Sequence, residues 1–280
     1  MSTVDALPRP AEISPARRPR WHHLALKIGP VILLPALGIV VWEACVAIFS
    51  PAEWLLPAPS AIAETLYQQH DRLWFHAQAT IAESLLALLL ALTAGLAVAV
   101  AITLSKTTER ALYPWVVASQ TVPILAVAPL LGVWVGYGTA QVLVATIFTF
   151  FPIVVIGVDT FRTTDQNLIA TARSMGAPTR WIWRHVTLPG ALPALLSGLK
   201  LASVFAVTGA VVAEYVGSDR GLGFLSEVTT GQFETVVTFA AVIWLAAIGL
   251  TYFAVISLLE RLLIPHRYRP TRRRIGETTH

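Results

Sequence analysis

The chain has 280 residues, of which 55% are hydrophobic and only 13% are charged, whereas about 25% are charged in an ordinary soluble domain. So little charge cannot cover a water-exposed surface, and so high an apolar content argues against a disordered chain. The composition therefore argues against a soluble enzyme and indicates a membrane protein, in which the net charge of +4 matters through its distribution along the chain.

Six apolar segments that could cross a bilayer follow one another, since a span needs about 20 apolar residues. They cover residues 28–50, 84–105, 113–135, 139–159, 191–216 and 235–259. The stretch from Ala111 to Val158 holds no charge and would measure about 72 Å as a single helix. Because the hydrocarbon core is only about 30 Å thick, we expect this stretch to divide into two spans at the glycine-rich sequence Gly136–Thr139.

Positive side chains gather on one side of these spans. Lysine and arginine are concentrated in residues 1–27, 105–110, 160–189 and 260–280. The connections on the other side hold only Arg72 and Arg220. Because positive charge marks the cytoplasmic side, we expect both termini in the cytoplasm. The predicted organisation is a basic N-terminal segment (1–27), an all-α transmembrane domain (28–264) and a basic tail (265–280).

The sequence offers no group of residues arranged for enzyme chemistry. All seven histidines fall outside the predicted spans, and the lone cysteine, Cys45, cannot form an internal disulfide or a metal site of several cysteines. The P-loop pattern G-x-x-x-x-G-K-[ST] is absent, so we expect no nucleotide to bind through such a loop. We therefore expect no catalytic residue, metal, cofactor or nucleic-acid partner, and a role in transport or as a scaffold.

The loop at 160–189 carries the most informative local pattern. Asp165 is a good N-cap, and Gly176 is a good residue to end the helix between them, which would have Leu168 and Met175 on one apolar face. A second short helix is expected to start at Pro178 and to carry arginine and tryptophan. The two helices fit either a docking element for another protein or a helix that lies at the lipid headgroups.

Several polar or helix-breaking residues near or within the predicted spans are candidates to line a translocation path. They are Ser119, Gln120, Thr121, Pro123, Lys200, Ser203 and Glu214. Lys200 has no evident acidic partner, and it fits either attraction of an anionic substrate or a side chain that reaches the interface or neighbouring carbonyl groups. Glu214 fits either an external gate or a solvated carboxylate at the interface.

The loop resembles the EAA signature of ABC-importer permeases, whose pattern is E-A-A-x3-G-x9-I-x-L-P. Gly176 takes the place of the glycine, and Val186, Leu188 and Pro189 follow at the same spacing. In that family the loop binds an ATPase subunit. The residues that the resemblance assigns to this contact are Ala170, Thr171, Ala172, Gly176, Ala177, Pro178, Arg180, Trp181, Leu188 and Pro189.

The first positions of the signature depart from the family pattern. Ala170 stands in place of the glutamate and Thr171 in place of the first alanine, whereas Ala172 matches the second. The frame of glycine and Leu-Pro is therefore present, but the acidic contact is missing.

Other segments are similar to the permeases for nitrate, sulfonates and taurine. Residues 56–60 are similar to their LPSPS lead-in, residues 122–138 to their third span, and residues 212–223 to their fifth span and the loop after it. Within these stretches, residues 132–138 and 214–223 are more similar to members that carry pyrimidine precursors of thiamine or riboflavin.

The resemblance implies an all-α permease of the type I ABC-importer fold, with six transmembrane helices and a cytoplasmic coupling-helix loop, in the bacterial inner membrane. It implies as partners a separate ABC ATPase that binds ATP and Mg²⁺, a periplasmic or lipid-anchored substrate-binding protein, a second copy of the permease, and lipid. The substrate would be a small organic solute, either a sulfonate-like anion or a pyrimidine- or riboflavin-like compound. The alternative is a secondary transporter or channel that works without an ATPase, which would need inverted repeats or charge pairs within the membrane.

Overall fold

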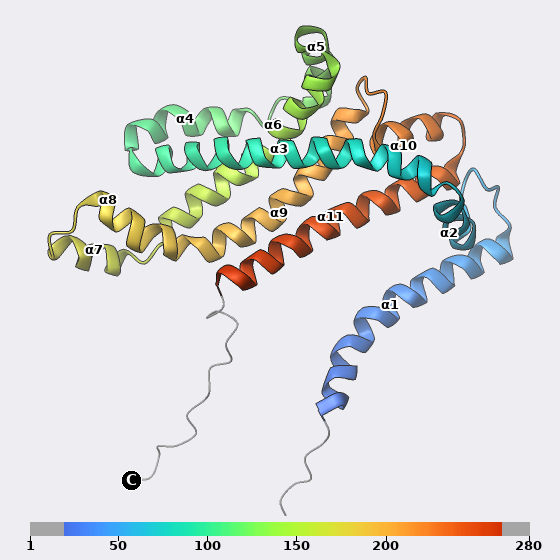
Figure 1. Ribbon diagram of the computed structural model, residues 1–280, viewed down its shortest axis with the longest axis horizontal. Coiled ribbons are helices and arrows are strands. Elements are labelled where there is room, and N and C mark those ends of the chain that lie inside the picture. The colour runs from blue at the N-terminus through green and yellow to red at the C-terminus, as the bar shows by residue number, and fades with distance from the viewer. Residues whose placement is uncertain (1–19, 265–280) are drawn as a thin grey trace, which may run out of the picture.

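The computed structural model describes residues 20–264, with side chains from Leu33 onward, and that part of the chain contains helices and no strands (Figure 1). The predicted basic segments 1–27 and 265–280 lie outside the described residues, except for residues 20–27 at the start of α1. The helices in chain order are α1 (Arg20–Phe49), α2 (Pro59–Gln68), α3 (His70–Leu104), α4 (Lys106–Ala118), α5 (Ile124–Val135), α6 (Tyr137–Arg162), α7 (Gln166–Ser174), α8 (Thr179–Ile182), the π-helix η1 (Trp183–Thr187), α9 (Leu188–Glu214), α10 (Leu222–Gly231) and α11 (Thr235–Leu263).

Four helical segments of the described chain are long and apolar enough to cross a membrane. They are His70–Leu104, Tyr137–Arg162, Thr179–Glu214 and Thr235–Leu263. Two further apolar helices are shorter, namely Leu33–Phe49 and Ile124–Val135. The all-helical class expected from the sequence is therefore confirmed, and the long helices account for the second, fourth, fifth and sixth predicted spans.

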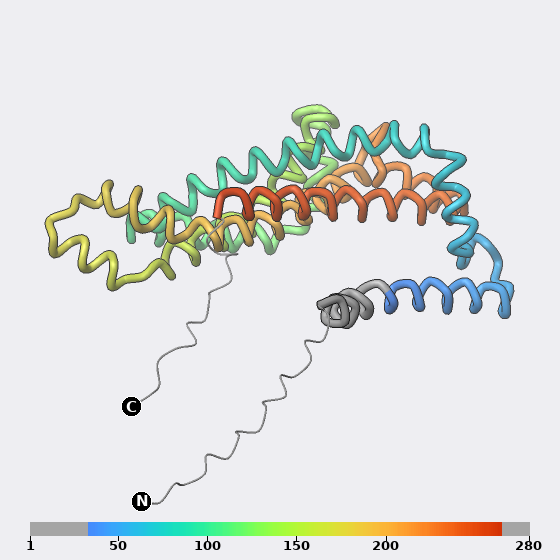
Figure 2. Tube along the Cα trace, turned by 60° about the horizontal axis from the view of Figure 1, so that its bottom comes forward, coloured from blue at the N-terminus to red at the C-terminus, as the bar shows by residue number. Residues whose placement is uncertain are grey.

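The centre of the molecule is the packing of α3, α6 and α9, with α11 beside α9 (Figures 1 and 2). Small residues allow these helices to approach closely, as is usual between membrane helices. A Cβ on Gly157 of α6 would lie 2.7 Å from that of Ala99 in α3, and one on Gly209 of α9 would lie 3.1 Å from the Cα of Ala145 in α6. The three helices therefore form one closely packed unit.

The first helix stands apart from this unit (Figure 2). It contacts α2, and its Trp42 ring lies 5.6 Å from that of Phe239 in α11. The Glu43 carboxylate accepts hydrogen bonds from the backbone N–H of Ser60, at 3.0 Å, and from its hydroxyl, at 2.7 Å. Ser60 lies in the first turn of α2, where backbone N–H groups have no partner within the helix. Glu43 therefore caps α2 and ties it to α1.

The prediction of one helix over residues 113–135 is wrong. The helix α4 ends at Ala118 and α5 starts at Ile124, with Pro123 in an extended conformation between them. Proline lacks an N–H and disfavours helical geometry in the residue before it. The prediction of a break at Gly136 is confirmed, because this residue has φ +81° and separates α5 from α6.

Several helices extend beyond the predicted apolar segments. The second predicted span begins at residue 84, but α3 begins at His70, because Leu73 and Ala77 in its first turns are buried against α10 and α11. The helices α2 and α10 were not predicted from the sequence. Both are short and join longer helices, so neither has a long apolar run that marks it.

Candidate functional site

Local hydrogen bonds define both ends of α7, in agreement with the sequence. The Asp165 carboxylate accepts from the backbone N–H of Asn167 at 2.9 Å and of Leu168 at 3.4 Å, as an N-cap does. At the other end, the N–H of Gly176 donates to the Arg173 carbonyl at 2.9 Å, and the N–H of Ala177 donates to the Ala172 carbonyl at 3.0 Å. Gly176 has φ +80°, so this end is a Schellman motif in which glycine suits the left-handed residue.

The second short helix runs directly into a long one. Pro178 is the N-cap of α8 rather than its first residue, one position from the prediction. Beyond α8, η1 leads into α9 without a break, so that one helical segment runs from Thr179 to Glu214. Pro189 lacks the N–H that an α-helix would direct to the carbonyl of His185, and the wider π-turn precedes it. The expected separate coupling helix is therefore the first turn of the α8–α9 helix.

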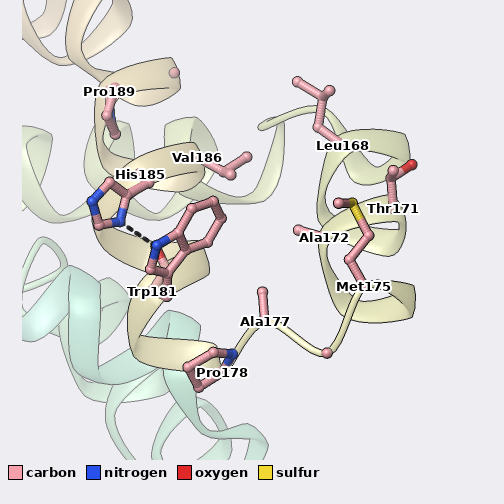
Figure 3. Close-up of a pocket in the computed structure, with 12 residues that line it drawn as sticks. Leu168, Thr171, Ala172, Met175, Ala177, Pro178, Trp181, His185, Val186 and Pro189 are labelled. Carbon is pink, nitrogen blue, oxygen red and sulfur yellow. Dashed lines mark hydrogen bonds between the residues drawn. The ribbon is translucent and has the colours of Figure 1, made fainter.

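A groove of about 760 Å³ separates α7 from the start of the α8–α9 helix (Figure 3). It is lined by Leu168, Thr171, Ala172, Met175, Gly176, Ala177, Pro178, Trp181, His185, Val186, Pro189 and Gly190. Its apolar side chains are unusually open to solvent, with Met175 82% and Leu168 57% exposed. The His185 ring stacks on that of Trp181 at 4.7 Å, which forms one wall. An exposed apolar groove of this kind is typical of a surface that binds another protein.

Positive charge lies on the same hairpin as the groove, although no arginine lines the groove itself. Arg173, Arg180 and Arg184 are exposed, and none of them forms an ion pair with a residue that the structure describes. Between residues 160 and 189, Asp165 is the only acidic residue, and its carboxylate caps α7. The α7–α8 hairpin, residues 165–187, therefore presents an apolar groove and three exposed arginines.

The base of the hairpin is held by the bundle. The rings of Phe161 in α6 and Trp183 lie 4.9 Å apart, and Ile182 is only 4% exposed. Arg162, at the end of α6, pairs with Glu109 of α4 at 2.6 Å. A displacement of the hairpin would therefore also move the ends of these helices.

Of the ten residues that the sequence assigns to ATPase contact, seven line the groove. They are Thr171, Ala172, Gly176, Ala177, Pro178, Trp181 and Pro189. Ala170 and Arg180 are exposed on the same hairpin, and Leu188 is 45% exposed at the start of α9. Their contact with an ATPase stays a prediction.

The residues predicted for a translocation path lie in two places. Ser119, Gln120, Thr121 and Pro123 are exposed in the link between α4 and α5, and the Ser119 hydroxyl donates to the carbonyl of Val116 at 2.7 Å. The others lie on α9. Their role along a path stays a prediction.

Lys200 has an acidic partner that the sequence analysis missed. Its Nζ forms an ion pair with Glu260 of α11, and it also lies 5.6 Å from the centre of the Phe253 ring. The Lys200 and Glu260 side chains are 16% and 2% exposed, respectively. Ser203 is fully buried and donates its hydroxyl to the Lys200 carbonyl at 2.7 Å. The carboxylate lies 60 residues away in the sequence, so no local pattern marks the pair.

Glu214, at the end of α9, is fully buried. The expectation of a solvated carboxylate is therefore wrong. Its carboxylate accepts from the Thr80 hydroxyl of α3 at 2.6 Å and from the backbone N–H of Gly223 at 2.5 Å. Thr80 was missed because it belongs to a part of α3 that precedes the predicted span. Among the side chains that the structure describes, from Leu33 to Ile264, there is no group of three or more metal-ligating residues close enough to hold an ion.

Comparison with known proteins places the chain among transporters. Residues 87–265 match the family described as binding-protein-dependent transport system inner membrane component. The chain is 38% identical to the riboflavin transport system permease protein RibX of Chloroflexus aurantiacus, over 89% of this chain and 92% of that protein. It is 35% identical to the formylaminopyrimidine transport permease protein ThiX of Halalkalibacterium halodurans, over 82% and 92%, and 30% identical to the taurine transport system permease protein TauC of Escherichia coli, over 89% and 94%.

Solved structures share the fold. An inward-facing structure of the MetNI methionine ABC transporter aligns with a TM-score of 0.62 at 19% identity, covering 69% of this chain and 98% of that one. An amino acid ABC transporter with histidines aligns with a TM-score of 0.58 at 19% identity, covering 72% and 97%. The helical arrangement is therefore that of type I ABC-importer permeases.

Proposed function

Because the chain belongs to the family of binding-protein-dependent transport system inner membrane components, we propose that its α7–α8 hairpin is the surface on which a separate ATPase subunit docks. The chain is a permease subunit of an ABC importer and a translocation subunit rather than an enzyme. The observation that carries the proposal is the exposed apolar groove at this hairpin. ATP and Mg²⁺ then bind to the partner, and this chain needs no cofactor.

The proposed topology has six crossings with both termini in the cytoplasm. Two crossings are needed beyond the four long segments. The short apolar helix α1 forms the first crossing, and the short apolar helix α5, together with α4, forms the third. The concentration of lysine and arginine on the side of the hairpin supports this orientation. The path for substrate then lies between this chain and a second copy. The α5 helix supports the dimer, because Val133 and Trp134 are 74% and 70% exposed on it.

The charge of the hairpin indicates the chemistry of the ATPase surface. Ala170 stands where related permeases carry a glutamate, and the same hairpin carries the exposed side chains of Arg173, Arg180 and Arg184. A complementary surface would present carboxylates beside apolar side chains, because opposite charges guide association and determine register. The ATPase of this importer therefore carries an acidic docking cleft.

The proposed substrate is a planar, uncharged heterocycle of the pyrimidine or flavin kind. Two of the similar permeases are named as transport proteins for formylaminopyrimidine and for riboflavin. Lys200 is the only lysine or arginine within the six predicted spans, and its charge is matched by Glu260. Because Lys200 is already paired, its charge is not available to attract a sulfonate, and this favours an uncharged substrate.

The experiment is affinity purification of the permease from its native membranes in mild detergent, comparing R180E/R184E with R110E. Arg110 is exposed on α4, so it controls for charge reversal away from the hairpin. We expect the double variant to lower recovery of the ATPase at least about tenfold, because it places like charges opposite the acidic cleft, and R110E to leave it unchanged. Recovery of wild-type permease alone would refute the docking proposal.

The same preparation, crosslinked, identifies the substrate. We expect it to contain a substrate-binding protein, which can be titrated calorimetrically with riboflavin, formylaminopyrimidine and taurine. Heat of binding with either heterocycle and none with taurine is the expected result. Binding of taurine alone would overturn the proposed substrate class and leave the docking proposal intact.

A further inference from the structure

One continuous helix connects the α7–α8 hairpin to the far end of the bundle. The segment from Thr179 to Glu214 contains 36 residues, which corresponds to about 54 Å at 1.5 Å per residue. Its first turn forms a wall of the groove and its last residue, Glu214, lies beside α10 (Figure 1). A shift of the hairpin along this axis therefore reaches Glu214 without passing through a flexible loop.

Glu214 joins three helices at that end. One carboxylate oxygen accepts from the Thr80 hydroxyl of α3 at 2.6 Å, and the other accepts from the N–H of Gly223 in α10 at 2.5 Å. Glu214 is fully buried, and so is Thr80. Because a buried carboxylate is costly unless it is hydrogen-bonded, these contacts strongly favour one position of α10.

The start of α10 is held by side chains from α3 in the same way. The N–H of Leu222 donates to the Thr80 hydroxyl oxygen at 2.8 Å, and the N–H of Gly221 donates to His76 Nδ1 at 3.2 Å. The first N–H groups of a helix have no partner within it. Here three successive N–H groups find partners on α3 and α9. We call His76, Thr80, Glu214, Gly221 and Gly223 the Glu214 cluster.

The two glycines fit the carboxylate closely. A Cβ on Gly221, which has φ +121°, would overlap the carboxyl carbon of Glu214. A Cβ on Gly223 would lie 2.8 Å from a carboxylate oxygen and 2.9 Å from the carbonyl oxygen of Val211. The spacing of the glutamate and the two glycines in the sequence is therefore explained by this contact.

The remainder of α10 packs into the bundle. Leu222 and Leu225 are buried in a cluster that also contains Leu73 of α3 and Val237 of α11. At its other end, the Thr229 hydroxyl lies 2.7 Å from that of Thr238. The helix α10 is thus attached at both ends.

We propose that Glu214 is a positioning residue that joins α10 to the end of the α8–α9 helix, so that movement of the docked ATPase reaches α10, at the outer side of the membrane, as one rigid displacement. The inference rests on the proposed function, in which the hairpin is the docking surface. It assigns to Glu214 the control of the outer mouth of the path, through α10 rather than through contact with substrate.

The experiment compares E214Q with E227Q in the assembled transporter reconstituted with its ATPase and binding protein. Glutamine keeps the size of the side chain but replaces one accepting oxygen with a donor, which faces another donor. Glu227 is exposed on α10 and serves as the matched control. We expect E214Q to capture the ATPase and hydrolyse ATP as the wild type does, while solute transported per ATP falls at least about fivefold, the lower end of coupling effects.

A distance measurement separates this role from general stability. Spin labels at T208C on α9 and Q232C after α10, both exposed positions, are introduced in a C45S background. We expect one narrow distance distribution, the same with and without ATP and vanadate, and a broader, nucleotide-dependent distribution in E214Q. The control E227Q should keep the narrow distribution.

Two results would overturn the proposal. One is a change in the wild-type distance on addition of nucleotide, which needs no variant. The other is normal transport per ATP in E214Q. Should E214Q fail to assemble, T80V removes the hydroxyl that links Glu214 to Leu222 while retaining the side-chain shape, and it must lower transport per ATP for the proposal to stand. Failure of the wild type to capture an ATPase would instead refute the docking function.

Discussion

The α7–α8 hairpin and the Glu214 cluster lie at opposite ends of one helix and are built in opposite ways. The hairpin is held by hydrogen bonds between near neighbours, such as Asp165 to Asn167, and leaves Met175 82% exposed. The Glu214 cluster is buried, and three of its hydrogen bonds join residues 134 to 145 positions apart in the sequence. The hairpin, as a docking surface, needs a conformation that its own local hydrogen bonds maintain. The Glu214 cluster, as a contact that transmits movement, needs hydrogen bonds between separate helices.

Glycine has a different task in each region. Gly176 in the hairpin has φ +80°, but an added Cβ would meet no atom within 4 Å, so only its backbone conformation requires glycine. Gly221 has a positive φ and also no room beside the Glu214 carboxyl group. Substitution should therefore be much more costly at Gly221 than at Gly176.

The largest effect is expected for G221A. The methyl group would overlap a buried carboxyl and occupy a strained backbone conformation, which together cost about 3 kcal/mol or more. The fraction of permease that remains monodisperse after heating in detergent should fall sharply. The control is G231A on the same helix, where an added Cβ meets nothing within 4 Å. Equal heat resistance of G221A and the wild type would show that the cluster is looser than its contacts indicate.

A smaller and local effect is expected for G176A. Alanine in the left-handed conformation costs about 1 kcal/mol, and the strain is confined to the turn between α7 and α8. We expect ATPase recovery to fall several-fold with no change in the heat resistance of the permease. The control G249A, in α11, has an open environment and an ordinary φ. A loss of heat resistance in G176A would contradict the view that the hairpin is held locally.

The smallest effect is expected for R162Q. It removes the ion pair with Glu109. The Arg162 and Glu109 side chains are 44% and 39% exposed, respectively, and such surface ion pairs contribute about 0.2–1 kcal/mol to the stability of the folded protein. Neither heat resistance nor ATPase recovery should differ measurably from those of the wild type, and E109Q should behave in the same way. A marked loss of ATPase recovery in either variant would show that α4 helps to hold the hairpin.

The parts of the structure that the sequence predicted are those that depend on neighbouring residues. Apolar runs marked the long helices, Gly136 marked the boundary between α5 and α6, and Asp165 and Gly176 marked the ends of α7. Pro123 was recognised as helix-breaking, but one span was still assigned to residues 113–135, whereas one helix ends at Ala118 and the next begins at Ile124. An apolar composition indicates that a stretch can lie in a membrane, but not that it forms one continuous helix.

The sequence by itself determined that this chain is helical, belongs in a membrane and carries two short helices in the loop at residues 160–189. Each of these follows from composition or from interactions within one helical turn. Only the tertiary structure decided that Lys200 meets Glu260 and that Glu214 is buried between α3 and α10. Such contacts join residues far apart in the chain, and their partners are selected by the packing of whole helices, which no local pattern records.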